Sequence, residues 1–312
     1  MMPVQLIRFT FLTLLISSFG ALAYQDLAMV EVLDKTSNTN DIDMNKHDSA
    51  DIIDVNSWLL GASLGYGEIT SHLTDEDDIG LYVLPDIRYY GEKFYFENST
   101  LGYSLAETPR YSVELLGRVN LDGLVFPEKY RNVIAAFASQ LSSRNFLGDL
   151  GPQLPQTEEE PVLYPQEKQL SYMVGAVARW YLPYSHLSWS VTKDVTAGHY
   201  GIESQLSSVS YFQLAQVSLE LQLALNYKSQ RLTNYYYGVD ESALPTGFDY
   251  LQYKPDAALN WHAQIQMAYP ISESWFLVTS LRYEAWHSEI TQSPIVKQDA
   301  SLAYFSGIKW VY

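Results

Sequence analysis

The feature that most constrains the fold is a two-residue alternation of apolar and polar side chains. Between residues 213 and 227 the odd positions from Val217 to Leu225 are apolar, whereas the positions between them are polar or small. Residues 259–269 repeat the pattern. Both segments are long enough to cross a bilayer as tilted strands, which takes about 9 to 11 residues. Because one face suits lipid and the other water, the pattern predicts an antiparallel transmembrane β-barrel.

Further segments of similar length fill most of the chain after residue 57. These candidate strands are residues 58–67, 81–90, 94–105, 111–120, 172–182, 187–195, 202–211, 275–286 and 302–312. A bacterial barrel with both ends in the periplasm needs an even number of strands. We therefore predict twelve strands, with residues 94–105 broken into two near Ser99, and keep ten as the alternative.

The N-terminus has the three parts of a secretory signal. Arg8 is followed by an apolar run over residues 9–19 and then by Ala21-Leu22-Ala23. The run is too short for a membrane-spanning helix, which needs about 20 residues, and the A-x-A sequence is typical of a cleavage site. We predict a cleaved signal peptide at residues 1–23, with a buried N-terminal helix as the alternative. Residues 24–57 are rich in Asp and Asn and predict a flexible acidic periplasmic tail.

Composition supports an exported barrel and excludes one class of partner. The chain has no cysteine, and its 25 Tyr, 7 Trp and 12 Phe are typical of proteins with aromatic belts at the membrane surfaces. The formal net charge of −17 argues against a nucleic acid as partner, because phosphate binding depends on Lys and Arg.

The connections between candidate strands alternate between tight and long. Tight turns at residues 183–186 and 270–273 are predicted to be periplasmic, and the longer connections at 74–78, 235–256 and 287–299 external. The longest connection, 121–170, has helical spacing of apolar residues at 130–141 and a linker-like tail at 152–165.

The last strand ends on an aromatic residue. Gly307, Trp310 and Tyr312 lie in an amphipathic segment at the very end of the chain. Such an ending resembles the signal by which the barrel-assembly machinery recognises outer-membrane proteins. The alternative is a soluble β-sandwich that ends on a strand by chance.

Strand parity predicts which charged side chains point into the barrel. A charge facing lipid at the bilayer midplane would cost about 2 to 4 kcal/mol, so charges should share the inward parity. The predicted lumen-facing residues are Asp86, Arg88, Glu114, Arg118, Arg179, Glu220, His262, Arg282, Glu284 and Lys309. These charges predict a salt-bridged plug in a narrow barrel, with a weakly selective pore as the alternative.

Catalytic and metal sites have little support in the sequence. His262 is predicted to lie near Ser280 and Arg282, without a motif that would make these residues catalytic. The six histidines show no metal-ligand spacing, and no cofactor is predicted. His199, between Gly198 and Gly201, is expected to cap a tight turn.

Two other loop features are assigned structural roles. Residues 235–237, three successive tyrosines, are expected in the outer aromatic girdle, with sugar or protein binding as the alternative. The acidic residues at 74–78 suit a solvated loop tip better than a dedicated calcium site.

Several short motifs, taken in order, resemble the MipA/OmpV family, the MltA-interacting protein and its relatives. They are LPDIRYYG at 84–91, FYF at 94–96, LGY at 101–103, GHYG at 198–201, YYGV at 236–239, SPIV at 293–296 and the terminal strand. The resemblance covers residues 58–312. Two departures lie in loops: residues 121–170 are expanded, and the stretch after Tyr253-Lys254-Pro255 lacks the expected glycines.

This resemblance implies an outer-membrane protein without catalysis. The family is regarded as a scaffold that links a lytic transglycosylase to a penicillin-binding protein in peptidoglycan turnover, and some relatives as porin-like or as adhesion factors. We therefore expect a scaffold for peptidoglycan-remodelling enzymes in the Gram-negative cell outer membrane. A narrow channel for small solutes is the alternative.

Overall fold

The computed structural model describes residues 56–74, 78–120, 122–124, 168–196, 198–241, 244 and 248–312. The predicted signal peptide, nearly all of the acidic tail, the candidate helix at 130–141 and the linker at 152–165 lie outside these residues. No helix in the described segments is long and apolar enough to cross a membrane.

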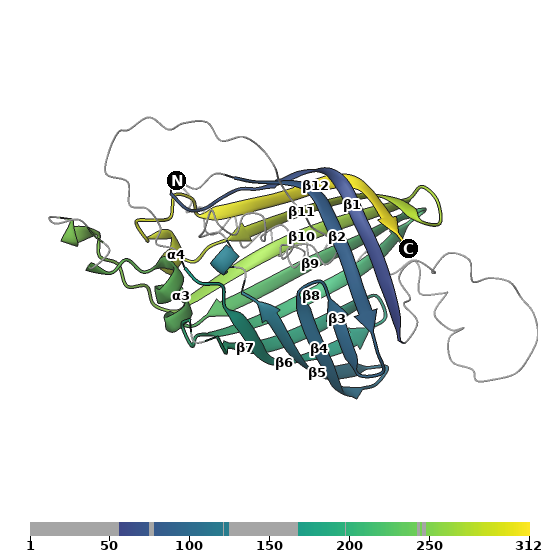
Figure 1. The fold of residues 1–312 in the computed structure, drawn as a ribbon, viewed down its shortest axis with the longest axis horizontal. Helices are drawn as coiled ribbons and strands as arrows, with labels where there is room; N and C mark the ends of the chain where they lie inside the picture. The colour runs from purple at the N-terminus through teal and green to yellow at the C-terminus, as the bar shows by residue number, and fades with distance from the viewer. Residues whose placement is uncertain are drawn as a thin grey trace, which may run out of the picture. The chain divides into compact units, whose positions relative to one another are not determined.

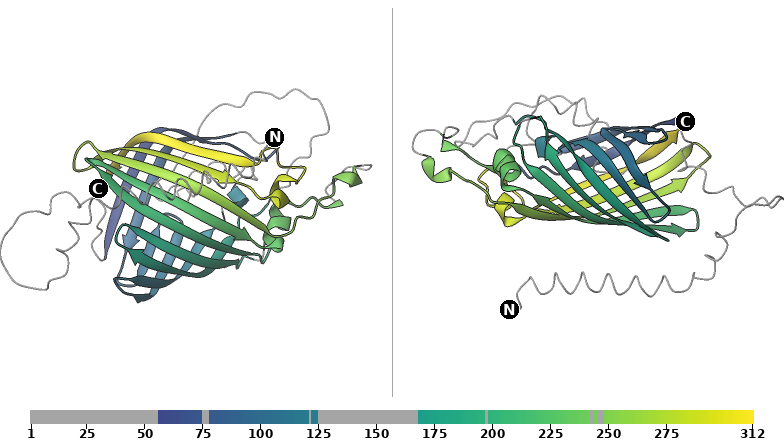
Figure 2. Two further views of the ribbon diagram at one scale, coloured as in Figure 1. Left: turned by 180° about the vertical axis from the view of Figure 1, so that it is seen from behind. Right: turned by 90° about the horizontal axis from the view of Figure 1, so that it is seen from below.

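The described residues form a closed barrel of twelve antiparallel strands, which confirms the predicted architecture (Figures 1 and 2). Each strand pairs with its neighbours in the chain, and β1 pairs with β12 to close the sheet. The strands are β1 (Ser57–Ile69), β2 (Ile79–Tyr90), β3 (Phe94–Glu97), β4 (Thr100–Glu107), β5 (Tyr111–Val119), β6 (Tyr172–Leu182), β7 (Ser185–Asp194), β8 (Ile202–Leu214), β9 (Val217–Lys228), β10 (Ala258–Pro270), β11 (Trp275–Ala285) and β12 (Ala300–Val311).

Side-chain exposure follows the predicted two-residue period along β9. Leu223, Leu225 and Tyr227 are 38%, 46% and 43% exposed, whereas Ala224 and Asn226 between them are buried. Successive side chains of a strand point to opposite faces of the sheet. The exposed apolar row therefore forms the outer, lipid-facing surface, and the buried row faces the inside of the barrel.

The chain also breaks where a break was predicted. Strands β3 and β4 are separated by a turn at Asn98 and Ser99, and Asn98 has the left-handed φ of 52° that asparagine tolerates in turns. The hairpin of β3 and β4 is short because β3 has only four residues. Only Arg88, Tyr89 and Tyr90 of β2 pair with β3.

The two ends of the barrel differ as the loop lengths predicted. One end carries the tight turns and the C-terminus, where Val311 N–H donates to Ser274 O in the β10–β11 turn at 3.0 Å. The other end carries the long connections, which contain α3 (Gln230–Tyr237), α4 (Ser288–Thr291) and the 3-10 helices η1 (Asp122–Leu124) and η5 (Asp249–Leu251). We call these the turn end and the cap end.

Candidate functional site

A buried triad of charges joins β2 to β12 across β1 on the inner wall. Asp86 is fully buried, and its carboxylate accepts hydrogen bonds from Arg88 Nη2 at 2.7 Å and Lys309 Nζ at 2.8 Å. Strand β1 lies between β2 and β12, and its residue opposite Asp86 is Gly61. Because Gly61 has no side chain, the side chains of Asp86 and Lys309 can meet across β1. Two cations thus share one anion at the inner wall.

A second pair joins β5 and β6 through Glu114 and Arg179. The carboxylate of Glu114 also accepts hydrogen bonds from Ser112 Oγ and Tyr95 OH, each at 2.7 Å. Tyr95 can reach across β4 because Gly102 has no side chain to block its ring. This cluster connects β3, β5 and β6 and passes over β4 on one side of the barrel.

A third pair crosses the interior, from β5 to β8. Arg118 Nη2 donates to Glu203 Oε2 at 2.9 Å, and Asn226 Nδ2 donates to the other carboxylate oxygen of Glu203 at 2.7 Å. Because β5 and β8 are not neighbours in the sheet, this contact runs through the lumen. It narrows the space available to a solute.

His262 belongs to a fourth charged group, on β10 and β11. Arg282 Nη2 donates to Glu284 Oε2 at 2.7 Å and lies 3.3 Å from His262 Nδ1. The predicted neighbour Ser280 is wrong, because the register places Ser280 opposite Gln266 and places Glu284 opposite His262. Along β11, Ser280 is two inward-facing positions away from Glu284, beyond Arg282. The histidine therefore contacts a salt bridge and not a hydroxyl nucleophile.

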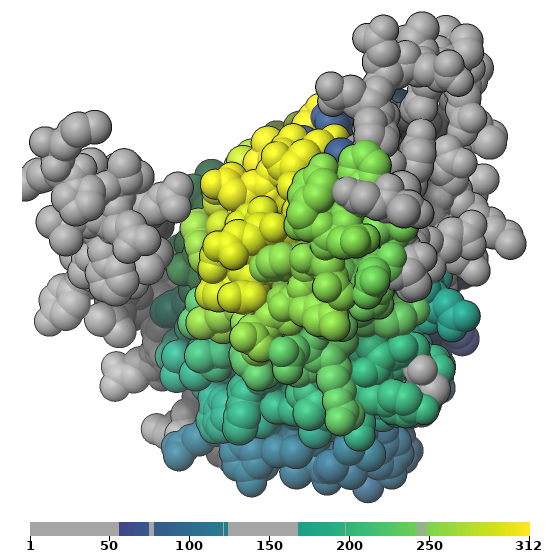
Figure 3. All heavy atoms as spheres, turned by 90° about the vertical axis from the view of Figure 1, so that its left-hand side faces the viewer, coloured from purple at the N-terminus to yellow at the C-terminus, as the bar shows by residue number. Residues whose placement is uncertain are grey.

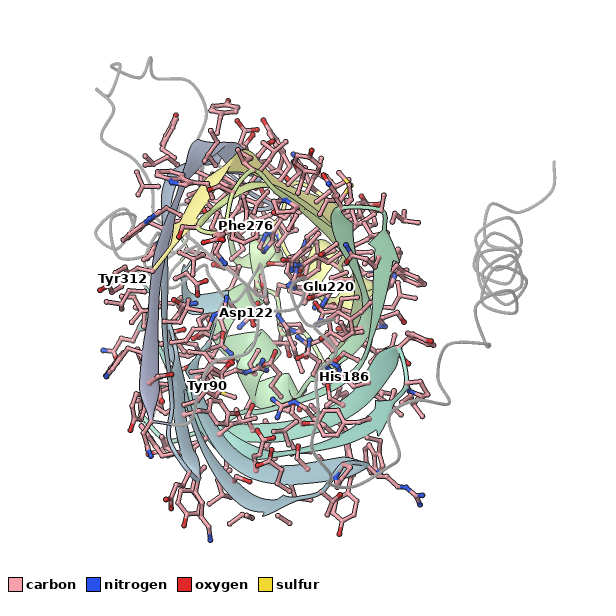
Figure 4. The ribbon with its side chains drawn as sticks, turned by 90° about the vertical axis from the view of Figure 1, so that its right-hand side faces the viewer. Tyr90, Asp122, His186, Glu220, Phe276 and Tyr312 are labelled. Atoms are coloured by element: carbon pink, nitrogen blue, oxygen red, sulfur yellow. The ribbon has the colours of Figure 1, made fainter. Side chains whose placement is uncertain are left out.

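Glu220 is the remaining predicted charge, and it is half-buried on β9 toward the turn end. Figure 4 shows Glu220 on the inner side of the strands, with Asp122 within the ring that they form. The predicted lumen charges thus lie on the buried parity of their strands, and most of them are joined in ion pairs.

Helix η1 brings Asp122 into the interior near the cap end. Asp122 Oδ1 accepts hydrogen bonds from Lys228 Nζ at 2.5 Å and from Tyr237 OH at 2.8 Å. Lys228 ends β9, and its ammonium also lies 5.1 Å from the ring centroid of Trp286, within cation–π range. These contacts tie the β5 exit, the barrel wall and α3 together.

An apolar cluster covers the cap end above this contact. It contains Leu73, Leu232, Tyr236, Tyr237 and Ile290, which are all fully buried. Figure 3 looks onto this end, where the green and yellow atoms of α3, α4 and adjoining segments gather over the middle of the face. We call α3, α4 and residues 71–74 the cap.

The three successive tyrosines are part of this cap, so the expected aromatic girdle is wrong for them. Tyr236 and Tyr237 lie in α3 with no exposed surface, and burial raises the pKa of Tyr237 well above its ordinary value. The prediction placed residues 235–237 at the start of an external connection and did not include a helix there. A helix turns successive side chains by about 100°, which lets adjacent tyrosines pack inside the cap.

His72, in the cap, is buried between two aromatic rings. Its ring centroid lies 4.4 Å from that of Trp286 and 5.8 Å from that of Tyr237. Burial, assisted by the positive charges of Lys228 and Lys297 and opposed by Glu284, lowers the pKa of His72 to about 3. The imidazole is therefore neutral at neutral pH.

We expect the cap to loosen when the pH falls below 6.5, the ordinary pKa of histidine. His72 can bind a proton when the cap is open but not when it is closed. The free energy that favours the closed cap is therefore fully present above pH 6.5 and declines as the pH falls toward 3. The open population should rise by up to roughly tenfold per pH unit. Limited proteolysis of the cap across pH 7 to 4 measures this. His72→Gln should flatten the profile, whereas His186→Gln at the turn end should leave it unchanged.

His199 has the expected role at its turn. Its Nδ1 accepts a hydrogen bond from Gly201 N–H at 2.8 Å, while Nε2 lies 3.0 Å from Ser171 Oγ. Burial lowers the pKa of His199, opposed by the charge of Asp194. Throughout the described ranges, no group of three His, Cys, Asp or Glu side chains is placed to hold a metal ion.

The acidic loop is described only in part, since residues 75–77 lie outside the described residues. Asp78 Oδ1 accepts a hydrogen bond from Ser71 N–H at 2.8 Å, which is a local contact within the connection.

Sequence reasoning missed three charged residues of the interior. Glu203 lies on the inward parity of a segment that was predicted as a strand, so parity could have identified it. Lys228 ends β9 just beyond the predicted strand, and Asp122 follows β5 in a long connection. No local pattern indicates that Asp122 turns into the barrel, because its partners lie more than a hundred residues away.

Comparison with known proteins places the chain among outer-membrane proteins. The family model described as "MltA-interacting protein MipA" matches residues 60–312. The outer membrane protein YiaT of Escherichia coli (strain K12) is 24% identical over 257 residues, covering 80% of this chain and 89% of the relative. The 24 kDa outer membrane protein of Pasteurella multocida (strain Pm70) is 25% identical over 115 residues, covering 36% of this chain and 45% of the relative.

Solved outer-membrane barrels are similar only in general fold. An outer membrane channel from Pseudomonas putida F1 is 10% identical with a TM-score of 0.36, covering 87% of this chain and all of the channel. An anion-selective porin from Comamonas acidovorans is 5% identical with a TM-score of 0.33, covering 82% of this chain and 99% of the porin.

Proposed function

This chain belongs to the MltA-interacting protein MipA family, and from that premise we propose that it is a non-enzymatic outer-membrane scaffold for peptidoglycan-remodelling enzymes. The partners that this role requires are a lytic transglycosylase and a penicillin-binding protein. The observation that carries the proposal is the filled interior: ion pairs cross the lumen and a packed cap covers one end. Such a barrel suits a rigid membrane anchor better than an open pore.

The turn end is the surface that we assign to these partners. Both ends of a bacterial barrel chain lie in the periplasm, and here the C-terminus lies with the tight turns. Peptidoglycan enzymes are periplasmic, so the turns would face them. The predicted signal peptide at 1–23 and the assembly signal at Gly307, Trp310 and Tyr312 would deliver the barrel to the outer membrane. The predicted acidic tail at 24–57 would lie in the periplasm on the side of the turns and of the partners.

Charge reversal at the turn end should weaken partner recovery. Arg110 and Glu273 are exposed in two of the tight turns, so the double variant Arg110→Glu/Glu273→Lys changes the surface and not the barrel interior. We expect tagged, detergent-solubilised protein to recover a lytic transglycosylase from an envelope extract, and the variant to recover several-fold less. Glu241→Lys, an exposed position at the cap end, is the matched control. Repeated recovery of no murein hydrolase or synthase would contradict the scaffold.

A narrow channel for small solutes is the second candidate, and one observation favours it. His262 Nε2, Gln264 Nε2 and Arg282 Nε are buried on the inner wall without a hydrogen-bond partner among the described residues. Buried polar groups of this kind are usually satisfied by water, so they favour a hydrated path beside the ion pairs. Discrete conductance in a planar bilayer that shifts on Arg118→Ala or Arg282→Ala would favour the channel over the scaffold.

A further inference from the structure

The barrel wall is interrupted between β2 and β5, on the cap side of the β3–β4 hairpin. Residues 79–87 of β2 pair with β1 on one edge, but pairing with β3 on the other edge begins only at Arg88. The β4–β5 ladder likewise begins at Leu101 and Gly117. Within the described strands, roughly 25 Å of the β2 edge therefore has no paired strand. In Figure 1, β8, β9 and β10 of the far wall are visible through this part of the near wall.

The sequence protects this edge against the addition of another strand. Ile87 O and N–H face away from β1 and are capped by Asn98, which donates from its backbone at 2.8 Å and accepts through Oδ1 at 3.0 Å. Pro85 has the same parity as Ile87, so at the next position that faces the opening there is no N–H to donate. Proline inside a strand is typical of unpaired edges, because it cannot donate a hydrogen bond to a neighbouring strand. A pairing strand from a second chain is therefore a poor occupant.

Around residues 79–84 the surroundings of the edge are apolar on both sides of the wall, and the buried charge of Asp86 lies nearer the hairpin. Tyr82, Val83 and Ile87 on the outer side are 40%, 38% and 38% exposed, in continuity with the lipid-facing rows of the neighbouring strands. Behind the edge, Leu81 and Leu84 pack with Phe305 and Ile69 in an apolar cluster on the inner wall. The ring of Phe305 lies over Gly307, where a Cβ would come within 2.8 Å of it. The other inward groups described above are mostly charged or polar.

We propose that this edge is a lateral binding site for one alkyl chain of a membrane amphiphile. The opening lies among the exposed apolar side chains that face lipid, so lipid hydrocarbon would meet it from outside. An alkyl chain makes no backbone hydrogen bonds, so the capping by Asn98 and Pro85 does not oppose it. Its burial against Leu84 and the inner apolar cluster would be driven by the hydrophobic effect. This site is independent of any partner bound at the turn end.

A photoreactive fatty acid tests the site on the full-length protein in detergent. The probe is a saturated acid that carries a diazirine in its chain, and adducts are mapped by peptide mass spectrometry. We expect labelling of residues 81–84 and of the hairpin tip at 98–101 that saturates with probe concentration. This labelling should fall roughly tenfold when unlabelled acid is present at about ten times its dissociation constant.

The ordinary lipid-facing wall provides the internal control. Labelling at Leu277 and Ile308, which are exposed on fully paired strands, should rise in proportion to the probe and resist competition. Leu84→Asp should reduce the saturable labelling several-fold, whereas Val209→Asp, at a buried apolar position on β8, should not. Non-saturable labelling everywhere, or no adduct at the β2 edge of the wild-type protein, would overturn the proposal.

Discussion

Replacing Asp86 with asparagine is expected to lower the free energy of unfolding by about 3 to 5 kcal/mol, the usual cost of breaking a buried ion pair from one side. Asp86 has no exposed side-chain surface, and the side chains of its partners Arg88 and Lys309 are only 8% and 9% exposed. The amide keeps the size of the carboxylate but removes the single negative charge that both cations share. Two buried positive charges would then face each other across β1.

Urea unfolding of the protein refolded in lipid vesicles, followed by tryptophan fluorescence, measures this loss. Asp249→Asn is the matched control, because Asp249 is exposed in η5 at the cap end. Surface substitutions of this kind usually change stability by less than about 0.5 kcal/mol. If Asp86→Asn behaved like Asp249→Asn, the triad would not hold β2 and β12 together as described.

Replacing Tyr237 with alanine is expected to open the cap. The side chain is fully buried, contacts the ring of His72 and donates a hydrogen bond to Asp122. Truncating a buried aromatic side chain to alanine typically costs about 3 to 5 kcal/mol. The barrel strands do not depend on this ring, so the loss should appear as local opening at the cap end while the wall stays folded.

Two readouts follow the opening of the cap. Limited proteolysis should cleave the region around α3 much faster in Tyr237→Ala, whereas the heat-modifiable gel mobility of the barrel should be unchanged. Tyr237→Phe keeps the ring and removes the hydroxyl, so it should have a smaller effect of about 1 to 3 kcal/mol. Tyr250→Ala, at a side chain that is 74% exposed, is the control. Equal cleavage of all four proteins would contradict the closed cap.

Strand positions were predictable because a membrane barrel imposes a period of two on every strand. The break near Ser99 was predicted for another reason: eleven candidate segments fall one short of an even number of strands, so residues 94–105 were divided in two. Parity also separated exposed apolar side chains from the buried charges. The alternation and the parity of a side chain depend only on residues close to it in the sequence, so both could be predicted from the sequence alone.

The cap and the pairing of charges depend on contacts between distant parts of the chain. Asp122 meets Lys228 and Tyr237 only after the barrel closes, and no local pattern records that contact. The helix α3 was missed because its tyrosines were assigned to an external connection and to the aromatic girdle of the membrane surface. The interruption of the wall at Pro85 was also missed, although a proline inside a predicted strand favours an edge.

Spin labelling along β9 tests the central claim, a barrel whose alternate side chains face lipid and a filled interior. The chain contains no cysteine, so single cysteines at successive positions from Val217 to Lys228 can each carry one label in lipid vesicles. We expect collision with dissolved oxygen to be high at odd positions and low at even positions, and the mobility of the label to follow the same period. A flat profile, or a polypeptide that stays monomeric and folded in buffer without detergent, would contradict it.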